Sequence, residues 1–319
     1  MKARYWIAGT AVAAAGVYTI LSRRAPAHPR AHLLDLEPEA KIPDEENGSV
    51  YFIGTATTLI RYQGLTILTD PNFLYRGQQV HLGYGVHSTR LTDPGMDFDD
   101  LPPIDLVLLS HLHEDHFDKL VERRLARHTP ILTTASAART LAKRGFTGTY
   151  PLRSWDRVNV RKGHISLRVT ATPGAHGPLP AMAVLPDVMG CMLDFRNERD
   201  DRRYRMYLCA GTPTLRQLEE IRDSWPNLDL MLIQLGGARV MGMLVTMNAA
   251  QGVEAVRILR PELTIPIHYN DYDVFQEPLE EFVRAVERAG LRDRVRYLYH
   301  GEAHSFVPRG VLSEARPLV

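Results

Sequence analysis

The sequence has little cysteine and no excess charge of either sign. Only two of its 319 residues are cysteines, Cys191 and Cys209, so no disulfide framework is expected and the redox compartment stays open. The formal net charge is +1, and no basic run with interleaved aromatic residues occurs. Both absences argue against a nucleic-acid partner. The hydrophobic content of 45% is that of an ordinary globular protein.

An uncharged, mostly apolar stretch lies at the N-terminus, over residues 5–21 (YWIAGTAVAAAGVYTIL). As a helix it would span roughly 26 Å at about 1.5 Å per residue, slightly less than a bilayer core of about 30 Å. We expect a membrane anchor that associates the protein with a membrane. A signal peptide cleaved near APA at 25–27, which would give a secreted protein, and a buried soluble helix are the alternatives. Basic residues flank both ends, so the charges favour neither side of the membrane.

The rest of the chain divides into a linker and one large domain. Residues 22–48 are rich in proline, histidine and charge, which predicts a linker. From residue 49 to 319, strand and helix patterns alternate, which predicts an α/β layered domain. The segments VYFIG, TLIRY and LTILTD predict strands of one meander. The continuous apolar run at 105–110 (DLVLLS) predicts a strand buried on both faces.

The C-terminal half repeats these patterns. A helix is predicted after Asn248, which suits an N-cap. A second helix is predicted over 277–290, where Gly290 would end it, and a last strand is predicted over 294–300 (RVRYLYH).

Titratable residues concentrate directly after the apolar run 105–110. The stretch HLHEDH places His111, His113, Asp115 and His116 within six positions. Residues two apart in an extended segment project to the same side, and Asp115 and His116 would turn inward where the next helix starts. Imidazole suits zinc, iron or copper, and a carboxylate compensates charge. Strand ends in α/β sheets are where ligands bind, so the stretch predicts a metal site.

The stretch HLHEDH resembles the HxHxDH motif of the metallo-β-lactamase fold hydrolases. Residues 50–71 are similar to the opening strands of that family, and TATPGAHG (170–177) and IPIHYNDYDVF (265–275) to its segments that carry further histidine ligands. The resemblance covers roughly residues 49–307. It is closest to the branch that contains sugar-metabolism lactonases and the phospholipase D acting on N-acylphosphatidylethanolamines. It implies a four-layer αββα sandwich with the metal site at one edge, preceded here by the N-terminal apolar helix.

The resemblance also implies two adjacent metal ions, which we expect to be zinc, with iron or manganese as alternatives. The first ion would be held by His111, His113 and His176, and the second by Asp115, His116 and His268. A metal-bound hydroxide would attack the substrate, because coordination lowers the pKa of water to about 7. Asp115 and His116 are the catalytic candidates. Asp70 would orient a ligand or the metal-bound water.

One expected ligand is missing. The family carries an aspartate that bridges both metals, and in the corresponding segment 208–215 (LCAGTPTL) this chain has Thr212. Two divalent cations about 3.5–4 Å apart repel each other, and a bridging carboxylate offsets that repulsion. Three outcomes stay open: a site with one metal, a thiolate supplied by Cys209, or a fold kept without catalysis. A second departure is Thr55, where relatives often have histidine.

Two further segments are candidates for substrate contact. Residues 72–96 form a long loop of the kind that often covers an active site. Four of its side chains either line a substrate entrance or pack on the surface: Tyr75, His81, Tyr84 and His87. Arg239 follows a glycine pair, and either contacts an anionic substrate group or lies in a surface turn.

These observations predict a metal-dependent hydrolase that acts on a phosphodiester, with a lactone or another ester as the alternative substrate. The N-terminal apolar segment favours a lipid or another small molecule presented at a membrane. A binding protein without catalysis is the rival hypothesis, because Thr212 replaces the bridging acid.

Overall fold

The computed structural model of the protein describes residues 31–37, 47–83, 85–177, 186–240 and 242–310. The apolar segment 5–21 and Tyr84 lie outside these ranges, so the expected N-terminal helix is not among the described elements. Within the described ranges, no helix is both long enough and apolar enough to cross a bilayer.

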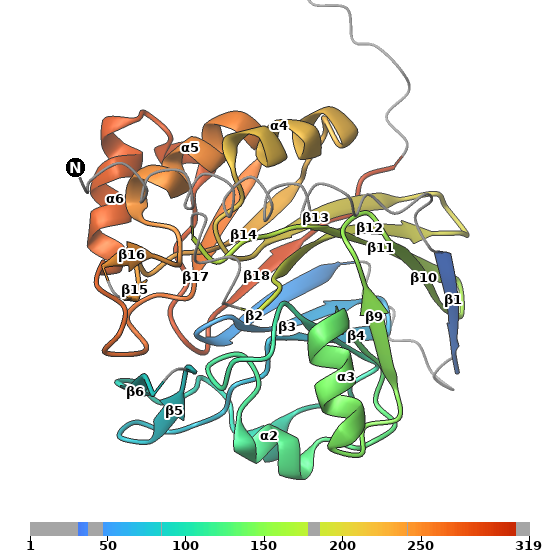
Figure 1. The fold of residues 1–319 in the computed structure, drawn as a ribbon. Helices are drawn as coiled ribbons and strands as arrows, with labels where there is room; N and C mark the ends of the chain where they lie inside the picture. Colours follow the sequence, from blue (N-terminus) through green and yellow to red (C-terminus); the bar gives the residue numbers. More distant parts are fainter. Residues whose placement is uncertain (1–30, 38–46, 84, 178–185, 241, 311–319) are drawn as a thin grey trace, which may run out of the picture. The chain divides into compact units, whose positions relative to one another are not determined.

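Two seven-stranded sheets form the centre of the domain (Figure 1). The first contains, in spatial order, β18 (Ala303–Phe306), β2 (Gly48–Gly54), β3 (Thr57–Tyr62), β4 (Leu65–Thr69), β7 (Leu106–Leu109), β8 (Ile131–Thr134) and β9 (Thr149–Leu152). The second contains β1 (Ala31–Leu36), β10 (Arg157–Lys162), β11 (Ile165–Pro173), β12 (Met189–Asn197), β13 (Arg203–Cys209), β14 (Leu230–Gln234) and β17 (Leu263–Ile267).

The two sheets pack face to face, because buried residues of both form one cluster, including Ile60 and Leu108 of the first sheet and Leu193 and Leu232 of the second. The outer face of the second sheet is covered by α4 (Leu215–Ser224), α5 (Ala249–Leu259) and α6 (Leu279–Arg288). The outer face of the first sheet packs against α2 (Lys119–Arg124) and α3 (Ala135–Lys143). The predicted four-layer αββα architecture is therefore confirmed.

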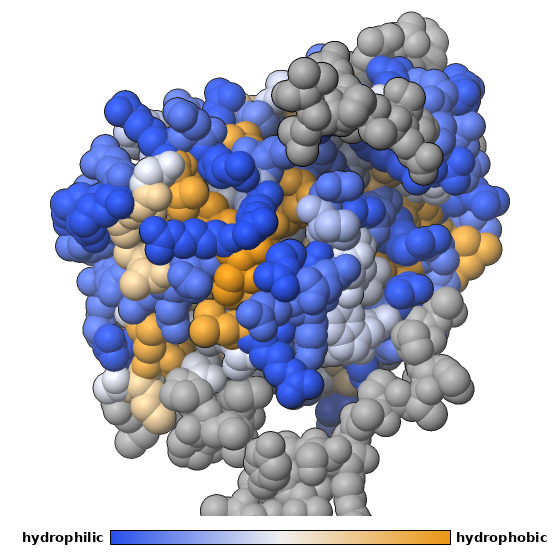
Figure 2. All heavy atoms as spheres, turned by 90° about the horizontal axis from the view of Figure 1, so that it is seen from above, coloured by the Kyte–Doolittle hydropathy of each residue, from blue (hydrophilic) through white to orange (hydrophobic). Residues whose placement is uncertain are grey.

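The local patterns account for most of these elements. β2, β3 and β4 pair antiparallel as the predicted meander, and β7 is buried along its length between its parallel neighbours β4 and β8. Asn248 caps α5 with a capping box. Seen from above the view of Figure 1, the surface is mostly hydrophilic, with apolar residues showing between the polar ones (Figure 2).

Two stretches differ from the prediction. The predicted linker 22–48 contains β1, an edge strand that pairs parallel with β10 and packs Leu34 and Leu36 against the cluster between the sheets. The last strand is β18, and not 294–300. Two residues of that stretch are buried, Val295 in the cluster under the helices and Leu298 in the cluster between the sheets, whereas Tyr299 is 75% exposed.

Short elements complete the described part. They are the hairpin β5 (Gln79–His81) and β6 (His87–Thr89) inside the long loop 72–96, the hairpin β15 (Arg239–Val240) and β16 (Met243–Leu244), and the 3₁₀ turns at Phe98–Asp100 and Arg292–Arg294.

Candidate metal centre

The HLHEDH stretch leaves the end of β7 and runs to α2. β7 is parallel to β4 and β8, so its C-terminal end lies at the sheet edge where ligands collect. Asp118, two residues after the stretch, is the N-cap of α2 and accepts a hydrogen bond from the backbone N–H of Val121 at 2.8 Å. The stretch is therefore fixed by a strand at one end and a capped helix at the other.

The first group of candidate ligands contains His111, His113 and His176, whose ligand atoms all lie within 4.8 Å of one another. His111 Nε2 is 3.1 Å from His113 Nδ1. His176 Nδ1 lies 3.5 Å from the carbonyl of Val245, while its Nε2 is buried and has no hydrogen-bond partner among the described residues. Burial and the neighbouring imidazoles lower the pKa of His176 to about 3, so the ring is neutral at pH 7. A neutral imidazole with a free nitrogen is a metal ligand.

The second group is arranged around Asp115. Its Oδ2 lies 3.6 Å from His116 Nε2 and 3.5 Å from His268 Nε2. Asp115 Oδ1 and His268 Nε2 are buried without hydrogen-bond partners in the described part of the chain. His111 also belongs here, because its ligand atom lies within 4.8 Å of those of Asp115 and His116. Buried polar atoms are rarely left without partners, so these donor atoms fit a metal ion. His268 Nδ1 lies 3.0 Å from the carbonyl of Leu235, which directs Nε2 toward Asp115.

The charges in the second group are coupled. Burial alone would raise the pKa of Asp115, but His116 and His268 lower it below its ordinary value. Burial would likewise lower the pKa of His116, but Asp115 and Asp70 outweigh it and raise that pKa. The group thus holds its carboxylate in the ionised form that metals bind.

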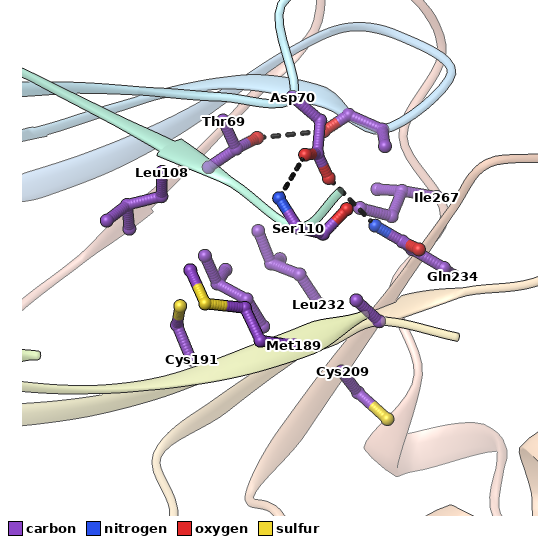
Figure 3. Close-up of a pocket in the computed structure, with 13 residues that line it drawn as sticks. Thr69, Asp70, Leu108, Ser110, Met189, Cys191, Cys209, Leu232, Gln234 and Ile267 are labelled. Carbon is purple, nitrogen blue, oxygen red and sulfur yellow. Dashed lines mark hydrogen bonds between the residues drawn. The ribbon is translucent and has the colours of Figure 1, made fainter. Parts of the chain in front are cut away.

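Asp70 lies behind the cluster and fixes His116. Its Oδ1 accepts a hydrogen bond from the backbone N–H of Ser110 at 2.7 Å, and its Oδ2 accepts one from Gln234 at 3.0 Å. Oδ2 also lies 3.2 Å from His116 Nδ1, which leaves Nε2 facing the cluster. Asp70 therefore has the orienting position expected for it. Figure 3 shows it beside Ser110 and Gln234, above apolar residues that line a cavity. That cavity offers about 20 Å³ to a water-sized sphere, enough for one water.

Thr212 takes part in a clamp around His176. Its hydroxyl accepts a hydrogen bond from the backbone N–H of Gly177 at 2.8 Å and donates one to the carbonyl of Ala175 at 2.9 Å. The backbone N–H of Thr212 donates to the same carbonyl at 2.7 Å. The hydroxyl proton is therefore already used, and in the two ligand groups found among the described residues Asp115 supplies the only carboxylate.

Cys209 and Arg239 lie apart from the ligand groups. Cys209 is buried in the cluster beneath the helices, and burial raises the pKa of its thiol to about 12. Its sulfur points away from Asp70 and Ser110 (Figure 3), so it does not replace the missing carboxylate in this structure. Arg239 is exposed and donates a hydrogen bond to the carbonyl of Gly242 at 3.1 Å, which matches the surface-turn interpretation.

The long loop 72–96 is tied to the metal stretch. The backbone N–H of His81 donates a hydrogen bond to the carboxylate of Glu114 at 2.8 Å, and the rings of His81 and His87 lie 4.9 Å apart across the hairpin. Tyr75 is 42% exposed and donates a hydrogen bond to Asp97 at 2.8 Å. The hairpin histidines thus lie next to HLHEDH, whereas the hydroxyl of Tyr75 is engaged elsewhere.

Sequence reasoning missed several buried polar residues around the candidate ligands. Ser110 and Gln234 each stand as the polar end of an apolar run, and this pattern at a strand end is a signal that could have been used. Asn72, Arg90 and Asp271 carry no such signal, because their contacts join segments far apart in the sequence.

Comparisons with known proteins show the family and the fold. Residues 66–269 match the model of a family described as "Beta-lactamase superfamily domain". A UPF0173 metal-dependent hydrolase from Archaeoglobus fulgidus is 26% identical over 211 residues, which cover 63% of this chain and 82% of the relative. Another from Salinibacter ruber is 25% identical over 251 residues, covering 76% and 94%.

Solved structures share the fold. An isothiocyanate hydrolase from Delia radicum gut bacteria superposes with a TM-score of 0.68 at 18% identity, covering 81% of this chain and 99% of that one. A metallo hydrolase from Ignicoccus hospitalis gives a TM-score of 0.58 at 21% identity, with coverage of 82% and 98%.

Proposed function

Since this chain belongs to the β-lactamase superfamily domain family, we propose that it is a metal-dependent hydrolase that cleaves a phosphodiester. The observation that carries the proposal is the pair of buried ligand groups that share His111 at the end of β7. Relatives named metal-dependent hydrolases support the reaction class. The phosphodiester substrate is proposed because the site has a threonine, Thr212, where the family has a carboxylate.

The residues of the cluster have different roles in metal binding and catalysis. When bound, zinc, or alternatively iron or manganese, would polarise a substrate oxygen and lower the pKa of a water. His111, His113 and His176 would hold an ion as neutral ligands, and His116, His268 and Asp115 would form the second position. Asp115 would bind the ion through one carboxylate oxygen, and its other oxygen would accept a hydrogen bond from the attacking water and orient it.

The charge at Thr212 favours an anionic substrate. With a threonine there, Asp115 supplies the only carboxylate in the two ligand groups, and Asp70 stands behind it. Two divalent cations would then carry positive charge that Asp115 offsets only in part. A phosphodiester brings a negative charge into the site, whereas a lactone or neutral ester does not. We therefore propose one tightly held ion and a second ion whose binding depends on an anion.

A lipid phosphodiester is the substrate that the N-terminal segment favours. The uncharged run 5–21 would place the domain at a membrane surface, within reach of lipid headgroups. The membrane association and the lipid are part of the proposal.

Metal content tests the proposal first. Elemental analysis of protein purified without chelator and equilibrated with zinc should give close to one ion per chain, rising toward two with inorganic phosphate. An unchanged content on adding phosphate would contradict the charge argument. Content near zero in folded protein would contradict the enzyme hypothesis.

Activity is tested with one anionic and two neutral substrates. Bis(4-nitrophenyl) phosphate should be hydrolysed faster than a nitrophenyl ester or a simple lactone. His116→Ala should abolish the reaction, and His164→Ala, a histidine outside both groups, should leave it unchanged. Preference for the neutral substrates would favour the lactonase alternative. If the wild type is inactive and Thr212→Asp creates activity, the natural protein is the non-catalytic binding protein.

A further inference from the structure

Arg90 is a fully buried cation beside the metal centre, with 0% of its surface exposed. Its Nη1 donates hydrogen bonds to Thr55 Oγ1 at 3.0 Å and to Asn72 Oδ1, and its Nε donates to the carbonyl of Thr92 at 3.1 Å. Nη2 lies 3.8 Å from a carboxylate oxygen of Asp271. A guanidinium is always charged and its burial costs free energy. A role for Arg90 in the neighbouring site would account for that cost.

Asp271, also fully buried, is the counter-ion of this cation and the hub of the network. Its carboxylate accepts hydrogen bonds from the backbone N–H of Thr55 at 2.6 Å and from the hydroxyl of Thr92. His300 Nε2 lies 3.1 Å from it. Asp271 follows His268 by three residues, so the network is anchored on the segment that carries this ligand.

The backbone of His268 is in a conformation that needs such support. Its φ is 63°, and Asn270 and Thr55 have φ values of 58° and 51°. Residues other than glycine are disfavoured in this left-handed region and persist where surrounding contacts fix them. The N–H of His268 donates to the carbonyl of Thr55 at 2.6 Å. Thr55 therefore holds His268 through its carbonyl and Asp271 through its N–H, while its hydroxyl is held by Arg90.

The same guanidinium reaches the other half of the site through Asn72. The side-chain amide of Asn72 donates a hydrogen bond to the carbonyl of Glu114 at 2.8 Å, directly before Asp115. The hydroxyl of Tyr272 donates to Asn72 Oδ1 at 3.0 Å, and the Tyr272 ring lies 5.3 Å from the guanidinium carbon. One cation thus joins the segment of His268 to the segment of Asp115.

We propose that Arg90 is a positioning residue for the metal ion held by His268 and Asp115: it fixes Thr55, Asn72 and Asp271, and these fix the two ligand segments. This inference rests on the proposed metal site and not on the proposed substrate. The planar fork of arginine bonds several acceptors at once, which a lysine ammonium does not reproduce. Lysine should therefore restore the charge and part of the function only.

The test is a cobalt titration of the full chain after chelator treatment, in the presence of inorganic phosphate, followed by visible absorption. His268→Ala identifies the absorption component that depends on His268. Arg90→Met should weaken that component 10- to 100-fold, as is usual for residues that support metal ligands. Arg90→Lys, which keeps the charge and guards against failure to fold, should give an intermediate loss.

Lys162→Met is the matched control, because Lys162 pairs with Asp105 at 2.7 Å in another largely buried ion pair. Asp105 precedes β7, at the end opposite His111. This variant should lose stability but bind cobalt like the wild type. Wild-type cobalt binding in both Arg90 variants, or the same loss in Lys162→Met, would overturn the positioning role. So would a His268→Ala variant that binds like the wild type. A wild type that binds no cobalt would overturn the proposed function, and this role with it.

Discussion

Replacing Thr212 with valine tests whether this residue holds the His176 segment. The change keeps the shape of the side chain and removes its hydroxyl, and with it the bonds to Gly177 and Ala175. The carbonyl of Ala175 keeps the backbone N–H of Thr212 as a partner at 2.7 Å. The N–H of Gly177 is left without the hydroxyl that accepts its hydrogen bond.

The expected loss is about 2 kcal/mol in the free energy of unfolding. One net hydrogen bond contributes about 1 kcal/mol, and a partly buried N–H left without a partner costs about 1–3 kcal/mol. The added methyl group offsets up to about 0.8 kcal/mol. Because about 1.4 kcal/mol is a factor of ten, a loss of about 2 kcal/mol borne by the His176 segment would weaken metal binding by His111, His113 and His176 roughly 30-fold.

Urea unfolding of the chelator-treated protein and a zinc competition titration measure the two effects. Thr133→Val is the matched control, since the hydroxyl of Thr133 is fully buried without a hydrogen-bond partner among the described residues. That variant should be neutral or slightly stabilising, and its zinc affinity should not change. Thr212→Ser should retain both properties. Equal stabilities and equal zinc affinities in the two valine variants would refute the clamp.

Two further predictions concern the same region. Burial lowers the pKa values of His111, His113 and His176, so the unfolded chain binds more protons than the metal-free folded protein below pH about 6.5. The stability of the folded protein should be fully present above that pH and should fall toward pH 3. The raised pKa of His116 opposes this loss but is outweighed by the three lowered pKa values. A urea midpoint that stays constant from pH 7 to 5 would contradict this prediction. Gly177→Ala should lower the melting temperature more than Gly145→Ala does. Both glycines have a positive φ, so the backbone strain of the substitution is common to the two variants. A Cβ at Gly177 would lie 2.4 Å from the carbonyl oxygen of Leu244, whereas a Cβ at Gly145 would have nothing within 4 Å. Equal melting temperatures would show that the Gly177 backbone shifts freely.

The parts of the site that the sequence predicts are those that lie close together in the chain. His111, His113, Asp115 and His116 follow one buried strand, so their proximity needs no knowledge of the tertiary structure. The single histidines at 176 and 268 were assigned by family resemblance alone. Their meeting with His111 depends on the second sheet stacking on the first, which no local pattern specifies.

The parts that could not be predicted are contacts between remote segments. Asp70 reaches Gln234 across 164 positions and Thr55 reaches Asp271 across 216. Similarly, the proline, histidine and charge content of residues 22–48 predicts a linker, whereas the pairing of β1 with β10 joins residues more than 120 positions apart. The stretch 294–300 forms one isolated bridge, from Val295 to Thr264, but no extended ladder with the described residues, and Val295 and Leu298 pack into two different apolar clusters.

The replacement at position 212 changes the charge of the site more than its geometry. Three of the six candidate ligands are held from outside the cluster: His176 by the Thr212 clamp, His116 by Asp70, and His268 by Leu235 and Thr55. None of these contacts requires a carboxylate at position 212. What the site lacks is therefore one negative charge and not the placement of its histidines. A substrate that supplies that negative charge would balance the positive charge of the metal ions in a site whose ligands are already positioned. The phosphate dependence of metal binding therefore separates an enzyme for anionic substrates from a site that has lost its function.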